Sequence, residues 1–145
     1  MLIELLIAFV LVAITVILHV LGIVLLLSGG FKASVQSITD VKSVIWLLVR
    51  ASWWMIVLHL LEICVWGFFY LWRDCLPDLN TAFYFSGVTY ATIGYGDVVL
   101  PKPWQWLGPI EGLTGILMCG LSASVFFAIV TRIYAARAKA IQETE

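Results

Sequence analysis

Five consecutive residues in the middle of the chain, Thr92, Ile93, Gly94, Tyr95 and Gly96, have the types and spacing that suit cation binding by backbone oxygens. Glycines at alternating positions allow backbone torsion angles that other L-residues resist, so consecutive carbonyl groups can all be turned to one side. One such segment presents a column of oxygens. Several copies about an axis would present stacked rings of oxygens, which can replace the water around a partly dehydrated cation. The segment therefore predicts ion binding by the main chain.

Catalytic and metal-binding side chains are not grouped in this sequence. No nucleophile, base and orienting group occur together, so we do not expect an enzyme. The three cysteines, Cys64, Cys75 and Cys119, lack paired metal-ligand spacing, and two of them lie in apolar runs, where a thiol acts as a small hydrophobe. Only Cys75 is expected near water, where an intersubunit disulfide is the alternative. A net charge of −1 gives no indication of a nucleic-acid partner.

The composition is that of a membrane protein, because 63% of the 145 residues are hydrophobic, 12% are charged and the mean hydropathy is +1.06. The apolar run from Leu2 to Leu27 carries only Glu4 and His19 as strongly polar residues and is long enough to cross a hydrocarbon core of roughly 30 Å. It lacks the basic start of a signal peptide. We therefore expect a transmembrane helix within residues 1–28 that stays in the mature protein.

The rest of the chain predicts an all-α integral membrane protein with two further transmembrane helices. A polar loop, 29–43, precedes an apolar run predicted as an outer helix, 44–72. The segment 80–91 is predicted as a short helix of roughly 18 Å, which cannot cross a bilayer and is therefore expected to be re-entrant. An inner helix, 104–135, and a charged tail, 136–145, follow.

Basic residues predict the orientation in the membrane. Six of them lie in or just after the first loop or near the end of the last span, namely Lys32, Lys42, Arg50, Arg132, Arg137 and Lys139. Only Arg73 and Lys102 lie on the other side. Because cytoplasmic segments carry the excess of basic residues, we expect the N-terminus outside and the C-terminus in the cytoplasm. No Arg-rich helix indicates a voltage sensor, and there is no room for a soluble ligand-binding domain.

The stretch Thr89-x-x-Thr92-Ile93-Gly94-Tyr95-Gly96-Asp97 resembles the signature filter of potassium channels. The resemblance covers residues 44–135 and implies a pore domain with a filter at 92–97. It also implies that the backbone carbonyls of Thr92, Ile93, Gly94 and Tyr95, with the Thr92 hydroxyl, bind K⁺, and that Gly96 ends the filter outside. The chain is too short to build a pore alone, and the resemblance implies a homotetramer in a plasma or bacterial inner membrane. No cofactor is expected apart from the conducted K⁺ ions.

The same resemblance assigns supporting roles around the filter. Thr89 is expected to donate a hydrogen bond behind the filter towards Tyr95, and Tyr84 is expected to reach Asp97. The carbonyl end of the short helix is expected to point at the central cavity, where its partial negative charge stabilises a cation.

Two positions depart from the family pattern. Many relatives have tryptophan at the positions of Tyr84 and Phe85, and phenylalanine cannot donate a hydrogen bond. Some have a glutamate at the position of Val88 that pairs with the filter aspartate. These departures leave the choice of ion intact but affect the rigidity and slow inactivation of the filter.

Polar residues inside the spans leave alternatives open. Glu62 and Glu111 are candidates for a proton-sensitive gate or for buried structural bonds, since intramembrane acids are costly and need partners. We favour a hydrogen bond to the pore helix for Glu62, and helix capping for Glu111, because Gly108-Pro109 suggests a helix start. His19 is expected in the core or at the lipid interface, because its own helix offers no acid at helical spacing.

The gating position and the class of membrane protein also remain open. A glycine midway along the inner helix is the usual bend point in the family, and Gly115 and Gly120 both satisfy the spacing. The leading hypothesis is a potassium-selective channel that conducts K⁺ passively through a tetrameric filter. The alternative is a non-conducting or regulatory membrane subunit with a pore-like fold that assembles with a larger channel or transporter.

Overall fold

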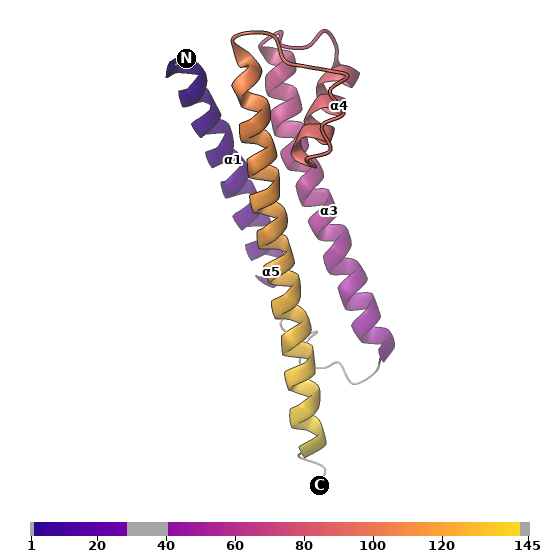
Figure 1. Ribbon diagram of the computed structural model, residues 1–145. Coiled ribbons are helices and arrows are strands. Elements are labelled where there is room, and N and C mark those ends of the chain that lie inside the picture. The colour runs from indigo at the N-terminus through magenta and orange to yellow at the C-terminus, as the bar shows by residue number, and fades with distance from the viewer. Residues whose placement is uncertain (1, 29–40, 143–145) are drawn as a thin grey trace.

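The computed structural model describes residues 2–28 and 41–142, and every regular element in these ranges is helical (Figure 1). Three of the described helices are long and apolar enough to cross a membrane. They are α1 (Leu2–Leu26), α3 (Val41–Trp72) and α5 (Leu107–Gln142). The predicted set of three candidate membrane helices is confirmed. Most of the predicted loop 29–43, including Lys32, and the end of the tail 136–145 lie outside the described residues.

The remaining elements are short. The helix α4 (Leu79–Tyr90) stands between α3 and α5, and a single 3₁₀ turn, η2 (Trp104–Trp106), precedes α5. The sequence placed the inner helix from 104 to 135, whereas the α-helix continues to Gln142. Alanine, arginine, lysine and glutamine are strong helix formers, so the charges of this segment do not end the helix.

The long helices form a bundle, and α4 lies at one end of it. In Figure 1, α1 and α5 run down the page, α3 runs up, and α4 lies beside the upper part of α3. The helix α1 packs against α3 and α5, while α4 packs against α3 and α5. The described part of α1 begins at the end that holds α4, and α5 ends at the opposite end (Figure 1).

Two apolar clusters hold the bundle. The first lies around α4 and includes Trp66 and Tyr70, both with 0% exposure. The second lies further down and joins α1, α3 and α5 through six buried residues, namely Leu26, Leu47, Ala51, Met55, Ile129 and Ile133. Large apolar side chains such as Trp46 and Phe127 remain exposed on the outside of the single chain. Such outward apolar faces suit contact with lipid or with further subunits.

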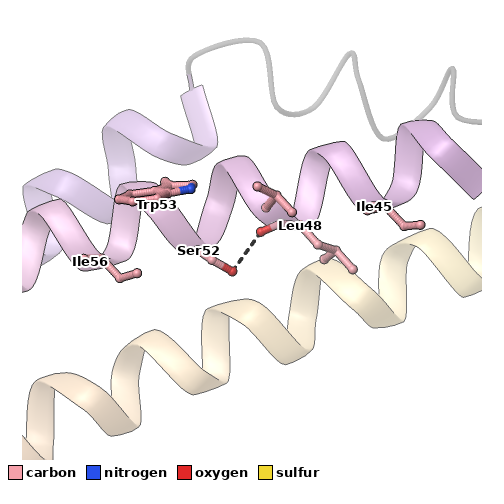
Figure 2. A pocket seen from close by; sticks show the side chains of 6 residues that line it. Ile45, Leu48, Ser52, Trp53 and Ile56 are labelled. Atoms are coloured by element: carbon pink, nitrogen blue, oxygen red, sulfur yellow. Dashed lines mark hydrogen bonds between the residues drawn. The ribbon is translucent and has the colours of Figure 1, made fainter.

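An apolar groove runs along the first half of α3, on which all of its lining residues lie (Figure 2). It is lined by Ile45, Leu48, Val49, Ser52, Trp53 and Ile56. The one hydroxyl in this lining, that of Ser52, already donates to the carbonyl oxygen of Leu48 at 2.9 Å. The groove therefore offers apolar surface and lies away from the ion-binding segment predicted from the sequence.

Glycine brings α5 very close to the end of α4. A Cβ added at Gly115 would lie 2.0 Å from the carbonyl oxygen of Tyr90, and one added at Gly112 would lie 3.4 Å from that of Thr89. At Gly120 an added Cβ would meet nothing within 4 Å. The helix runs unbroken past both candidate hinge positions. Gly115 thus has a packing role in this structure, while a hinge at Gly115 or Gly120 stays a prediction.

Candidate functional site

The short helix α4 is fixed at its start by a side-chain cap. Asp78 accepts a hydrogen bond from the backbone N–H of Thr81 at 2.9 Å and another from the Thr81 hydroxyl at 2.7 Å. These bonds satisfy a backbone donor that has no partner within the helix. They also hold the pKa of Asp78 below its ordinary value, because they favour the charged carboxylate.

The segment after α4 folds its N–H groups back onto the end of the helix. The N–H of Thr92 donates to the carbonyl oxygen of Thr89 at 2.9 Å. The N–H groups of Ile93 and Gly94 both donate to the carbonyl oxygen of Val88, at 2.8 and 3.1 Å. Three consecutive N–H groups are thus directed towards α4, and the carbonyl groups of this segment are left for another partner.

Positive φ angles recur at every second residue of the segment. They are 60° at Thr92, 56° at Gly94 and 78° at Gly96. Alternation of left-handed and right-handed backbone conformations places successive N–H groups on one side of a chain, which leaves the carbonyl groups to the other. The unusual torsion angles predicted for the two glycines are confirmed.

The positive φ of Thr92 was not predicted from the sequence. A β-branched residue is rarely found in the left-handed region, where the strain costs roughly 1–3 kcal/mol. Such strain persists only where the surroundings enforce it, and it gathers at functional sites. Here the bonds from Thr92, Ile93 and Gly94 to α4 hold the backbone in place.

The carbonyl oxygens of residues 92–96 have no hydrogen-bond donor within the described part of the chain. The segment is exposed in the single chain, with 54% of Ile93 and 68% of Tyr95 accessible. Exposed backbone acceptors and exposed apolar side chains lie together here. This combination suits a segment whose partners are ions and other subunits.

The expected bond between Tyr84 and Asp97 is confirmed. The Tyr84 hydroxyl on α4 donates to a carboxylate oxygen of Asp97 at 2.8 Å, so it ties the far end of the segment back to the helix. The expected bond from Thr89 to Tyr95 does not occur among the described residues, and the Tyr95 side chain is 68% exposed in the single chain. Thr89 contributes its backbone carbonyl instead.

The structure overturns the prediction that Glu111 caps a helix. The α-helix begins at Leu107, so Glu111 lies beyond its first turn, and its side chain is fully buried. One carboxyl oxygen accepts a hydrogen bond from Tyr70 on α3 at 2.7 Å, and the other lies 2.5 Å from the hydroxyl of Ser86 on α4. Glu111 therefore joins α5 to both neighbouring helices, α3 and α4.

Phe85, where the family pattern led us to expect tryptophan, takes a core position. Its side chain is 7% exposed, and its ring lies edge-on to that of Tyr70 with the centroids 5.3 Å apart. The hydrogen bonds in this region come from the neighbouring Tyr84 and Ser86.

Glu62 makes the buried hydrogen bond to the short helix that the sequence predicted. The hydroxyl of Tyr90, the last residue of α4, donates to it. Its other carboxyl oxygen lies 2.7 Å from Nδ1 of His19 on α1, and both side chains have 0% exposure. His19 is a core residue, as favoured, but its acidic partner comes from another helix. The sequence indicated this contact only by placing one polar residue, His19, Glu62 or Tyr90, in each of three separate apolar runs.

The cysteines differ from the expected burial pattern. Cys75 is buried rather than near water, since its N–H donates to the carbonyl oxygen of Tyr70 and folds the residue under the end of α3. Burial raises the pKa of its thiol to about 11. Cys119, expected to be buried, is exposed in the single chain, and Cys64 is half-buried. All three are free thiols, and the burial of Cys75 argues against the intersubunit disulfide.

Comparison with known families gives one match. A family model described as "Ion channel" matches residues 54–132, which include α4, the segment 92–97 and most of α3 and α5. No curated protein and no solved structure matches the chain.

Proposed function

The chain belongs to the ion channel family, and from this premise we propose that it is a potassium-selective channel. One observation carries the proposal. The N–H groups of Thr92, Ile93 and Gly94 are directed at the end of α4, so the carbonyl groups between Thr92 and Tyr95 are available to replace the water around K⁺. The Thr92 hydroxyl completes the proposed ligand set.

The free carbonyl groups also support a homotetramer. Irregular backbone at membrane depth is tolerated only where it is buried in protein or lines a water-filled cavity. One chain leaves residues 92–97 exposed, whereas four copies about an axis would enclose them as stacked rings of oxygens. The exposed Ile93 and Tyr95 side chains would then pack behind the filter, against a neighbouring subunit.

The position of α4 supports a re-entrant pore helix. Its 12 residues are too few to cross a bilayer, and both its neighbours, α3 and α5, are long enough to do so. Its C-terminal carbonyl end would face the ion pathway with a partial negative charge. In this arrangement Asp97 marks the outer, water-facing end, which places the N-terminus outside and the C-terminus in the cytoplasm.

The proposal is tested with purified protein in liposomes of defined lipid. A homotetramer that carries K⁺ flux, blocked by Ba²⁺, is the expected result. A stable homotetramer without flux would contradict the channel. A chain that is recovered only in a complex with a larger membrane protein would instead favour the non-conducting subunit.

A further inference from the structure

Five polar side chains from four helices form a closed ring of hydrogen-bonding contacts in the interior of the bundle. The ring runs from Glu62 to Tyr90, His59, Ser122, His19 and back to Glu62. After the Glu62–Tyr90 bond, the distances in this order are 3.0, 3.1, 3.3 and 2.7 Å. Each member makes a hydrogen-bonding contact with two others, and each histidine uses both of its ring nitrogens. Nδ1 of His59 also lies 3.4 Å from the Glu62 carboxyl group, across the ring.

The number of hydrogens in the ring fixes how many protons it must hold. Five contacts require five hydrogens. The hydroxyls of Tyr90 and Ser122 bring one each, the two neutral histidines bring one each, and an ionised Glu62 brings none, which makes four. One additional proton is needed to fill every contact. That proton gives the ring a net charge of zero, whether it resides on the carboxyl group or on a histidine.

The surroundings make a missing proton costly. His19 and Glu62 have 0% exposure, Tyr90 has 2% and Ser122 has 8%, while His59 is half-buried. Without the fifth hydrogen, one contact would bring two lone pairs together and the ring would carry an uncompensated negative charge. Buried polar groups without a partner and buried unpaired charges are both strongly unfavourable.

We propose that His19, His59, Glu62, Tyr90 and Ser122 together form a binding site for one proton, which holds α1 and α3 to the end of α4 and to α5. The site keeps five hydrogens at neutral pH and releases one to solvent as the pH rises. Two further titratable groups, Glu111 and Cys119 on α5, interact electrostatically with Tyr90. Neither makes a hydrogen bond to a member of the ring. The Ser122 hydroxyl has one alternative acceptor, the sulfur of Met55 at 3.5 Å.

A proton fits this site better than a divalent cation. His19, His59 and Glu62 bring donor atoms within 4.8 Å of one another, a spacing that a cation can also use. However, every one of these atoms already faces a hydrogen-bonding partner at 3.3 Å or less in the closed ring. The ring is complete with the chain's own groups and one proton.

The two histidines of the chain provide a selective probe, because both belong to the ring. Protein labelled with ¹⁵N-histidine, in detergent micelles, is followed by NMR from neutral to alkaline pH. Both histidines are expected to change together with one common midpoint. Two separate midpoints, or no change over this range, would overturn the proposal. Loss of the common transition after treatment with a chelator would indicate a bound cation and would also overturn it.

Glu62→Gln locks the ring in its filled state. The amide N–H of glutamine donates to the Tyr90 hydroxyl and so supplies the fifth hydrogen, while the amide oxygen still accepts from His19. The variant is expected to fold with a thermal unfolding midpoint close to that of the wild type at neutral pH and to lose the histidine transition. Glu111→Gln is the matched control, since it changes the other fully buried acid, and it is expected to keep the transition. A transition retained in Glu62→Gln would refute the site.

A second variant keeps the test valid if Glu62→Gln does not fold. Ser122→Ala breaks the ring of contacts between the two histidines. The imidazole groups of His19 and His59 are therefore expected to respond to pH separately rather than together. Persistence of one common midpoint in Ser122→Ala would contradict the closed ring. These readouts do not involve ion flux, so they stand or fall independently of the proposed channel function.

Discussion

The carbonyl oxygen of Tyr90 lies so close to Gly115 that a Cβ added at Gly115 would stand 2.0 Å from it. Tyr90 is the last residue of α4, and Gly115 lies on α5, so this contact sets how closely the two helices approach. Because the neighbour is backbone, it cannot move aside as a flexible side chain would.

Gly115→Ala is therefore expected to destabilise the chain. If α5 can shift to make room, the loss should be about 1–3 kcal/mol, which is typical of overpacking, and if it cannot, the loss should be larger. Gly120→Ala is the matched control, because nothing lies within 4 Å of its added Cβ. Thermal unfolding of the two purified variants measures the difference. Equal unfolding midpoints would contradict the close contact.

Gly94→Ala is expected to abolish or strongly reduce conduction while the chain still folds. The φ of Gly94 is 56°, and an added Cβ there meets nothing within 4 Å, so the effect is one of backbone conformation rather than of space. The left-handed conformation costs an alanine roughly 1–2 kcal/mol in each subunit. Gly87→Ala on α4, where an added Cβ also meets nothing within 4 Å and φ is not positive, serves as the control in the same flux assay. Wild-type flux in Gly94→Ala would show that this conformation is not required.

Tyr70→Phe is expected to destabilise the chain by roughly 1–3 kcal/mol, because it leaves one oxygen of the buried Glu111 without its donor. Combining it with Glu111→Leu, which removes both acceptor oxygens, should give less than the sum of the two separate losses, since the two residues share one hydrogen bond. Tyr134→Phe on the exposed side of α5 controls for the loss of a hydroxyl. The measurement is the thermal unfolding midpoint of the three single variants and of the double variant at positions 70 and 111. Strictly additive losses at these two positions would argue against the Tyr70–Glu111 hydrogen bond.

Tyr84→Phe removes the hydroxyl that holds Asp97 at 2.8 Å and is expected to loosen the Asp97 end of the proposed filter. Since the proposed carbonyl ligands are unchanged, selectivity should persist while openings become shorter. Single-channel recording measures both properties, with Tyr134→Phe as the control. Unchanged open times would show that the bond does not steady the filter.

Features set by short-range chemistry could be predicted from the sequence. The length of the apolar runs predicts the three candidate membrane helices, and the alternating glycines predict the positive φ of Gly94 and Gly96. The Tyr84–Asp97 bond was expected from the family pattern, because both residues belong to the motif region.

Contacts between distant helices could not be predicted in the same way. His19 and Glu62 are 43 positions apart, and no periodicity within one helix relates them. The inward direction of Glu111 depends on where η2 ends and α5 begins, a boundary of a few residues that local patterns do not fix. The left-handed conformation of Thr92 runs against local preference and is held by the hydrogen bonds that Thr92, Ile93 and Gly94 donate to α4.

The central claim is the proposal that the backbone carbonyl groups of residues 92–95 bind K⁺. Its most direct test is the reversal potential of purified protein in a planar bilayer, with K⁺ on one side and Na⁺ on the other. The account predicts a large reversal potential with the K⁺ side negative, because the proposed carbonyl rings replace the hydration of K⁺ and let K⁺ pass in preference to Na⁺. A reversal potential near zero, which means equal permeability to K⁺ and Na⁺, would contradict it.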